Sequence, residues 1–165
     1  MNKLLLVIDV QNDFINNNTK DVKDRISELV NSKEYNYIVF TKFINNENSI
    51  WYKRLDYKGC LLSNGQEIAI NTNYHKIINK NTYTALNDEL KQFIDENNID
   101  EIFLCGFDTD ACVYKTALDL FENNYNIYVL ENYTMSHKGL ELHNIFINKF
   151  EKINWKRKCD LEVSL

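Results

Sequence analysis

The sequence predicts an α/β protein in which a mostly parallel sheet of five or six strands has helices on both faces. Apolar runs typical of strands alternate along the chain with segments of helical periodicity, which is the order that parallel sheets require. The first run, Lys3 to Val10, is almost entirely aliphatic, as expected of a strand buried on both faces. The chain has 165 residues, enough for a substantial core. We therefore predict a single domain over residues 1–165.

The elements follow from hydrophobic periodicity in chain order. Strands are predicted where short runs rich in aliphatic and aromatic residues occur: residues 3–10, 35–41, 74–79, 102–107, 126–130 and, as a last edge strand, 152–155. Helices are predicted where apolar residues recur every three or four positions: residues 20–32, 84–97, 111–124 and 137–149. Ser136 is in place to cap the last of these helices. Residues 156–165 are predicted to be a tail.

A long segment from Lys42 to Asn73 shows no clear periodicity and is predicted to be irregular. Irregular segments of this length are uncommon in compact domains and often line a functional site. Trp51 and Tyr52 within it therefore have three possible roles. They shape a pocket, contact another subunit, or form a small core of the segment itself.

Composition and charge narrow the class of protein. The net charge is −5 and no basic block occurs, which argues against nucleic acid as the main partner. Asp9 interrupts the first apolar run, no cleavage site follows it, and no apolar run is long enough for a bilayer, so we expect neither a signal peptide nor a membrane partner. The four cysteines form no CxxC pair and have no zinc-ligand spacing: Cys60, Cys105, Cys112 and Cys159. This usage is typical of a reducing compartment, and we expect a cytoplasmic protein.

The stretch from Glu101 to Asn124 is predicted to run from a strand through a tight turn into a helix, with Cys112 in the first helical turn. Backbone N–H groups there have no intrahelical acceptor, and the helix dipole is positive. We therefore expect the pKa of Cys112 to lie below the value of about 8.5 for a free thiol. The same N–H groups suit an oxyanion formed on a carbonyl substrate. The alternative is that Cys112 only packs the helix onto the sheet.

Three reactive side chains are predicted at the carboxyl ends of strands: Asp9, Lys80 and Cys112. Ligands of parallel sheets bind at that edge. Asp9 follows the buried first strand, where a carboxylate is costly without a partner or a task. It is either a cap of the next turn or a general base, whereas Asp13 is read as a turn or capping residue. The convergence of the three predicts a reactive cysteine site.

Three segments carry a resemblance to a known superfamily. They read LLLVIDVQNDF at residues 4–14, KNTYTAL at residues 80–86 and CGFDTDACVYKTALDLFENNY at residues 105–125. In order and spacing they resemble the isochorismatase-like cysteine hydrolases, which include isochorismatases, nicotinamidases and N-carbamoylsarcosine amidase. The resemblance extends over most of the chain. It implies a Rossmann-like three-layer αβα sandwich.

The resemblance also implies the composition of the active site. It assigns a catalytic triad to Asp9, Lys80 and Cys112. It places a cis peptide bond between Phe107 and Asp108, which would bring the N–H of Asp108 beside that of Cys112 as an oxyanion hole. Asp9 would then take and return the proton, Lys80 would stabilise the negative charge, and Cys112 would attack the carbonyl.

The sequence departs from nicotinamidases at their metal site. Their ligands include a DxH motif just after the second strand, but residues 40–49 read FTKFINNENS here and contain no histidine. The one acid, Glu47, is outside the motif. His75, His137 and His143 are scattered along the chain, and we expect surface or packing roles for them. The interpretation is therefore an enzyme without a metal or other cofactor.

These inferences predict a metal-independent cysteine hydrolase of an amide or ureide C–N bond in a small molecule, acting through a thioester acyl-enzyme. Four aromatic residues are predicted to contact substrate, with core packing as the alternative for each: Phe14, Phe43, Tyr83 and Tyr114. A vinyl-ether hydrolase of the isochorismatase type is one alternative, although that reaction needs no thiol. A non-enzymatic redox or binding module that uses Cys112 is another. The resemblance further implies a homo-oligomer, a dimer or a tetramer.

Overall fold

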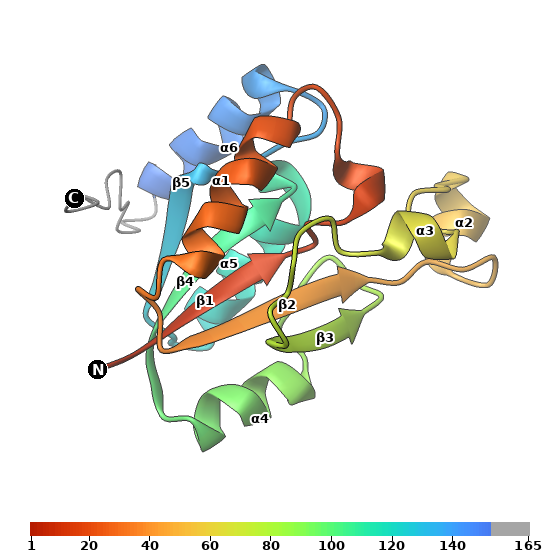
Figure 1. Ribbon diagram of the computed structural model, residues 1–165. Helices are drawn as coiled ribbons and strands as arrows, with labels where there is room; N and C mark the ends of the chain where they lie inside the picture. Colours follow the sequence, from red (N-terminus) through yellow and green to blue (C-terminus); the bar gives the residue numbers. More distant parts are fainter. Residues whose placement is uncertain (153–165) are drawn as a thin grey trace.

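The strand at the centre of the molecule is β1, Asn2–Ile8, as its aliphatic sequence predicts. The computed structural model describes residues 1–152, and in them five parallel strands form a sheet in the order β3-β2-β1-β4-β5 (Figure 1). The other strands are β2 (Tyr37–Phe43), β3 (Lys76–Lys80), β4 (Ile99–Phe107) and β5 (Ile127–Met135). The predicted α/β fold with a parallel sheet is confirmed. Of the predicted edge strand at residues 152–155, Lys152 ends a helix and the rest lies outside the described residues, as does the tail.

Both faces of β1 are buried, and its alternate residues enter two separate cores. Leu4, Leu6 and Ile8 belong to one apolar cluster, whereas Leu5 and Val7 belong to the other. All five side chains are fully buried. Period-two alternation of strand side chains explains why a continuous aliphatic run is needed here.

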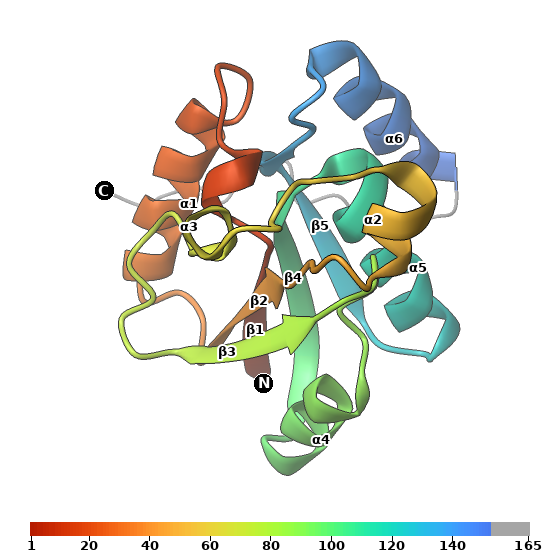
Figure 2. The same ribbon diagram turned by 90° about the vertical axis from the view of Figure 1, so that its right-hand side faces the viewer.

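The helices divide between the two cores (Figure 2). One face of the sheet is covered by α1, Lys20–Asn31, whose buried residues all lie in the cluster of Leu5 and Val7. The other face is covered by α4 (Asp88–Glu96), α5 (Tyr114–Glu122) and α6 (Leu140–Lys152), each of which contributes residues to the cluster of Leu4. Among the residues described, no helix is long and apolar enough to cross a membrane.

The segment predicted to be irregular, residues 42–73, contains two short helices. These are α2, Ile50–Leu55, and α3, Ser63–Gln66, and both lie beyond the carboxyl ends of the strands (Figure 1). The Ser49 side chain caps α2 by accepting the N–H of Tyr52. A short 3₁₀ helix, η1 at Asn12–Phe14, follows β1 at the same edge. Helices of four to six residues span too few turns for a periodic pattern, so the sequence did not reveal them.

Two predicted helices begin later than expected. The helix predicted at residues 84–97 begins at Asp88, because Ala85 donates its N–H to Thr116 Oγ1 of α5 and so leaves the helical path. Asn87 caps it instead, accepting the N–H of Leu90. The last helix begins at Leu140 rather than at residue 137. Residues 136–139 form a turn whose Gly139 has a φ of 121°.

The close approach of β4 to β1 depends on Gly106. Gly106 pairs with Ile8 and has a φ of 113°, a conformation that favours glycine. A Cβ at this position would lie 2.0 Å from the carbonyl oxygen of Ile8. Glycine therefore lets the end of β4 lie against the end of β1, directly before the residues of the candidate site.

Candidate active site

Asp9 follows β1 and lies fully buried at the carboxyl edge of the sheet. Its backbone has a φ of 49°, in the left-handed region. Thr41 of β2 holds it at two points: the Thr41 hydroxyl donates to Asp9 Oδ1 at 2.6 Å, and Thr41 Oγ1 accepts the Asp9 N–H at 3.1 Å. A buried carboxylate needs such partners. Thr41 was not singled out in the sequence, because a threonine in a strand carries no distinctive signal.

Lys80 is the last residue of β3, and its buried ammonium group lies between Asp9 and Cys112. Its Nζ is 2.6 Å from Asp9 Oδ2 and 3.5 Å from Cys112 Sγ. It also donates to the carbonyl oxygens of Thr82 at 2.8 Å and Tyr83 at 3.2 Å. Burial alone acts to lower the pKa of Lys80, but the charges of Asp9 and Cys112 outweigh it and the pKa is raised. Lys80 is therefore a cation in the resting site.

Cys112 lies in a π-helical turn, η2 at Thr109–Val113, that precedes α5. The peptide bond between Phe107 and Asp108 at the start of this turn is cis, as the resemblance implied. The N–H groups of Ala111 and Val113 both donate to the carbonyl oxygen of Asp108 at 3.1 Å. This packing presents the buried Cys112 thiol to the edge of the sheet where Asp9 and Lys80 meet.

The expectation of a lowered pKa for Cys112 is wrong for this structure. Burial raises the pKa of the Cys112 thiol well above its usual value, and the nearby Asp9 carboxylate raises it further. Lys80 acts in the opposite direction and does not compensate. The sequence argument considered only the helix terminus and had no measure of burial. The resting site therefore contains a neutral thiol, a carboxylate and an ammonium group.

A cavity of about 260 Å³ lies over Cys112 and is walled largely by aromatic rings. It is smaller than the range of about 300–1,000 Å³ found for drug-sized ligands. Three of the four aromatic residues predicted to contact substrate line it: Phe14, Phe43 and Tyr83. The remaining lining residues come from the 42–73 segment, from the turn that carries Cys112 and from the residues after β5: Trp51, Leu55, Tyr57, Asp108, Ala111, Cys112, His137 and Lys138.

Tyr114, the fourth of those aromatic residues, is not part of the cavity wall. Its ring packs against Phe146 and Phe150 of α6, with centroids 4.9 and 5.3 Å away. In α5 it lies two residues beyond Cys112, a spacing that turns a helical side chain away from the nucleophile. The packing alternative therefore describes Tyr114, and we do not include it in the candidate site.

Trp51 fixes the aromatic wall to the loop after β3. Its Nε1 donates to the carbonyl oxygen of Asn81 at 2.9 Å. Its ring meets those of Phe43 and Tyr83 edge-on, with centroids 5.7 and 4.5 Å away. Of the roles considered for Trp51, a place in the pocket wall is the one that the structure supports.

His137 was expected to have a surface or packing role, but it lines the cavity. Asp108 binds it twice. Asp108 Oδ1 accepts the backbone N–H of His137 at 2.8 Å, and Asp108 Oδ2 pairs with His137 Nδ1. This contact with Asp108 raises the pKa of His137. No sequence pattern indicates this pair, because 29 positions separate its members.

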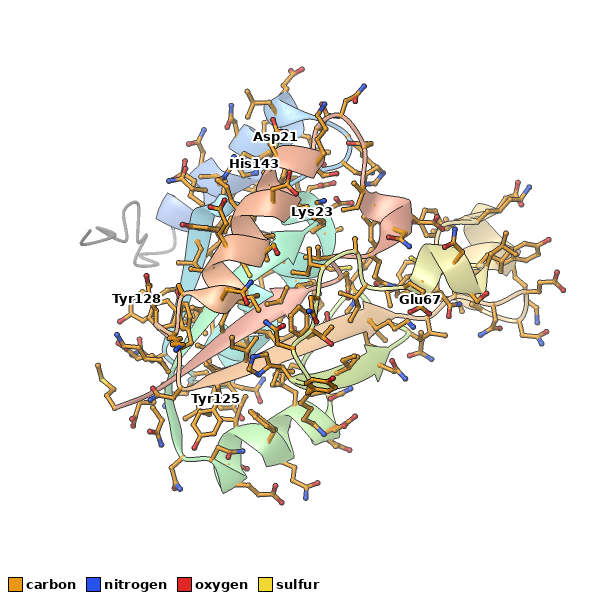
Figure 3. The ribbon with its side chains drawn as sticks, in the orientation of Figure 1. Asp21, Lys23, Glu67, Tyr125, Tyr128 and His143 are labelled. Atoms are coloured by element: carbon orange, nitrogen blue, oxygen red, sulfur yellow. The ribbon has the colours of Figure 1, made fainter. Side chains whose placement is uncertain are left out.

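A second set of polar side chains is buried behind η2, the turn that carries Cys112 and is called the nucleophile turn below. Thr109 Oγ1 is 2.7 Å from Thr134 Oγ1 of β5 and 2.8 Å from His143 Nδ1 of α6. His143 is labelled in Figure 3. Burial lowers the pKa of His143, which favours the neutral ring. The structure thus gives His143 the packing role expected of it, as an anchor of the turn.

The residues after β2, where nicotinamidase ligands would stand, do not fit a metal ion. Asn45 is buried there, and its Nδ2 donates to the carbonyl oxygens of Tyr57 and Gly59 at 3.0 Å. Its Oδ1 accepts from Ser49 Oγ and from the N–H of Asn46. Within residues 1–152, no group of three or more His, Cys, Asp or Glu side chains gathers as a metal site.

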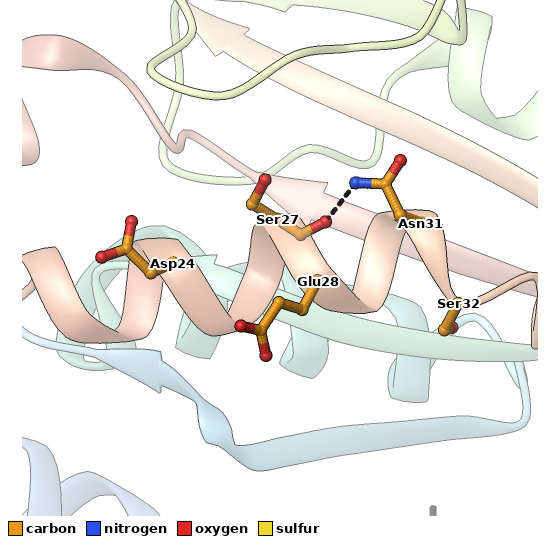
Figure 4. A pocket seen from close by; sticks show the side chains of 5 residues that line it. All are labelled: Asp24, Ser27, Glu28, Asn31 and Ser32. Atoms are coloured by element: carbon orange, nitrogen blue, oxygen red, sulfur yellow. Dashed lines mark hydrogen bonds between the residues drawn. The ribbon is translucent and has the colours of Figure 1, made fainter.

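A second pocket lies on α1, and its lining is polar whereas that of the first is largely aromatic (Figure 4). It is lined by polar residues of a single helix: Asp24, Ser27, Glu28, Asn31 and Ser32. Asn31 Nδ2 donates to the carbonyl oxygen of Ser27 within it. In the described hydrogen bonds neither of its serine hydroxyls pairs with its carboxylates, and Ser32 Oγ donates to the carbonyl oxygen of Leu29, so the cavity over Cys112 is the better candidate.

Comparison with known proteins identifies similar sequences and folds. A family model described as the isochorismatase domain matches residues 3–155. Isochorismatase family protein 2A of Dictyostelium discoideum is 37% identical over 62 residues, a match covering 36% of this chain and 31% of that protein. The matched segment thus spans about a third of that relative's length.

Two solved structures share the fold at low sequence identity. An isochorismatase-like hydrolase from Alkaliphilus metalliredigens has a TM-score of 0.83 and 22% identity, covering 95% of this chain and 94% of that one. A nicotinamidase from Bacillus subtilis has a TM-score of 0.85 and 22% identity, covering 97% of this chain and all of that one. These similarities extend over nearly the whole chain and support the same α/β architecture.

Proposed function

The chain belongs to the isochorismatase family, a family of hydrolases, and from this premise we propose that it cleaves an amide or ureide C–N bond of a small molecule through Cys112. The observation that carries the proposal is the position of Lys80. Its ammonium group lies 2.6 Å from the Asp9 carboxylate and 3.5 Å from the Cys112 sulfur, and Cys112 lines a cavity of about 260 Å³. A base, a cation and a nucleophile thus meet at one point.

The raised pKa of Cys112 is compatible with this role. The resting group of thiol, carboxylate and ammonium has no net charge. Transfer of the thiol proton to Asp9 leaves the net charge of the three groups unchanged, because the negative charge only moves from the Asp9 oxygen to the Cys112 sulfur. Lys80 contacts both atoms and stabilises the charge in either place. Activation therefore needs a short internal proton transfer rather than a free thiolate.

The proposed reaction has two halves. Cys112 sulfur attacks the carbonyl carbon while Asp9 takes the thiol proton, and the oxyanion is held by the N–H groups of Asp108 and Cys112. The C–N bond then breaks, Asp9 returns the proton to the leaving nitrogen, and a thioester remains on Cys112. Asp9 next takes a proton from water, which attacks the thioester and releases the acid and the thiol.

No step of this proposal passes through a metal ion, since Asn45 occupies the position after β2 with its amide fully hydrogen-bonded. The aromatic cavity wall favours a small planar substrate over a peptide. A redox module is less well supported, because the raised pKa of Cys112 keeps its reactive thiolate form scarce.

Ammonia release from a panel of small primary amides and ureides tests the proposal. We expect Cys112→Ala to lower kcat on the best substrate by on the order of 10³-fold or more, because the covalent step is lost. Cys112→Ser keeps the shape of the site and serves as a second variant, and thermal unfolding verifies that both fold. Equal ammonia release by wild type and Cys112→Ala contradicts the proposal, and turnover of a vinyl ether by Cys112→Ala would favour the isochorismatase-type reaction.

A further inference from the structure

The side of the cavity formed by Asp108 and His137 is built for recognition. Asp108 is buried and follows the cis peptide bond, in the turn that carries the nucleophile. Its carboxylate holds His137 at both the backbone and Nδ1. The ring of His137 also packs near Phe14, with a centroid distance of 6.1 Å. Both its position and its orientation are therefore fixed relative to Cys112.

The hydrogen bond at one ring nitrogen determines what the other can do. Because Nδ1 of His137 is occupied by Asp108, Nε2 is the nitrogen left for a ligand. Within residues 1–152, no group is found that bonds to Nε2. The pKa of His137 is raised by Asp108, which favours the ring form with hydrogen on both nitrogens. Nε2 is then a charge-assisted donor at the cavity wall.

The charges around this wall balance. His137 is paired with Asp108, and Lys138 Nζ lies 3.9 Å from Asp110 Oδ2. The carboxylate of Asp9 is paired with Lys80. Tyr57, Tyr83 and the Cys112 thiol complete the titratable groups that face the cavity, and burial raises the pKa of each, which favours their neutral forms. A substrate therefore meets a wall whose charged groups are paired, in which the ring of His137 is a hydrogen-bond donor fixed in place by Asp108.

We propose that His137 is a specificity-determining residue that donates from Nε2 to an acceptor on the substrate remote from the scissile bond. The substrate class is a small planar carbonyl compound, flanked by the aromatic wall, that carries such an acceptor on its ring. The inference rests on the proposed function and deepens it. A site built around a buried donor rejects analogues that lack the acceptor, because the donor is then left unpaired.

Aromatic aldehydes test this role without requiring the natural substrate. The Cys112 thiol adds to an aldehyde, so that a C–S bond forms and the thiol proton passes to the carbonyl oxygen, giving a reversible hemithioacetal. Benzaldehyde, pyridine-3-carboxaldehyde and pyridine-4-carboxaldehyde have the same shape, and only the two pyridines carry a ring acceptor. Occupancy is measured as protection of Cys112 from iodoacetamide, by mass spectrometry of the peptide that contains it. Glutathione treated in the same way gives the intrinsic reactivity of each aldehyde.

Two substitutions separate the two ring nitrogens of His137. His137→Asn places an amide near the position of Nδ1 and removes the Nε2 donor. His137→Gln reaches the position of Nε2 and loses the fixed pairing with Asp108. His75→Asn is the matched control, because His75 precedes β3 at the opposite edge of the sheet. Circular dichroism and melting temperatures confirm that all variants fold.

We expect the wild type to prefer at least one pyridine aldehyde by about tenfold or more beyond the preference of glutathione, as a charge-assisted hydrogen bond predicts. His137→Asn should lose this preference, His137→Gln should keep part of it, and His75→Asn should keep all of it. An unchanged preference in His137→Asn, or no preference in the wild type, overturns the role of His137. Failure of every aldehyde to protect Cys112 counts instead against the proposed hydrolase, and the role of His137 falls with it.

Discussion

The nucleophile turn is held by a histidine on each side, and the two sides differ. On the front, facing the cavity, Asp108 pairs with the half-buried His137. On the back, facing the core, the next residue, Thr109, pairs with the buried His143 and with Thr134. A carboxylate partner raises the pKa of the front histidine, and burial lowers that of the back one. The surroundings thus favour the protonated ring on one side and the neutral ring on the other.

This difference suits His137 to substrate recognition and His143 to support of the nucleophile turn. The front histidine keeps one nitrogen available to a ligand and tolerates a change of charge, because water reaches the cavity wall. The back histidine belongs to a closed network in which Thr109 uses its single hydroxyl for two partners. We therefore expect changes on the back to affect folding first, and changes on the front to affect binding first.

The largest effect on stability is expected from Thr109→Val. Valine has nearly the same shape but leaves His143 Nδ1 and the Thr134 hydroxyl without their shared partner. Unsatisfied buried polar groups cost about 1–3 kcal/mol, and we expect the free energy of unfolding in urea to fall by that amount. Asp108→Asn, which retains an oxygen for the N–H of His137, should cost less. A larger loss for Asp108→Asn than for Thr109→Val would contradict the division between front and back.

The next largest effect is the pH dependence of stability that arises from His143, behind the nucleophile turn. Because the folded-state pKa of His143 lies below the unfolded value of about 6.5, the unfolded state takes up the proton first as the pH falls. Its contribution to stability is present above about pH 6.5 and is lost as the pH falls from there to the folded-state pKa. Urea unfolding between pH 5 and 8 should therefore show the stability difference between wild type and His143→Asn shrinking on acidification. A difference that is constant or grows would be inconsistent with a neutral buried ring.

The smallest effect is expected from His137, facing the cavity, whose contribution to stability should change with pH in the opposite direction. The folded-state pKa of His137 is raised, so its contribution is fully present below about pH 6.5 and is lost as the pH rises through the folded-state value. The stability difference between wild type and His137→Asn should therefore shrink towards alkaline pH. Solvent at the cavity wall keeps it small. If the stability differences of the two histidine variants changed with pH in the same direction, the proposed contrast between His137 and His143 would be contradicted.

Much of the fold could be predicted from the sequence because it depends on long apolar runs. The buried β1 and the strand, turn and helix around Cys112 carry strong patterns, and the structure contains them near the predicted positions. The helices α2 and α3 could not be found in this way. They are short, and the 42–73 segment that contains them is held by side-chain hydrogen bonds such as those of Asn45 to the carbonyls of Tyr57 and Gly59, which leave no periodic pattern.

The candidate site divides in the same manner. Residues at strand ends converge because parallel strands end at one edge, so the meeting of Asp9, Lys80 and Cys112 could be predicted from topology. Their proposed catalytic roles stay predictions. Contacts between distant residues, such as Asp108 with His137, have no local signature. The direction of the pKa shift of Cys112 also depends on burial, which no motif reports.

The loop after β3 joins two properties that enzymes often vary separately. Trp51 holds the carbonyl of Asn81 from the aromatic wall, and Lys80 holds the carbonyls of Thr82 and Tyr83 from below. Three consecutive peptide groups therefore connect the surface that selects a substrate to the cation that governs its chemistry. A substitution at Trp51 that moves this loop would therefore also change the hydrogen bonds that the Lys80 ammonium group donates.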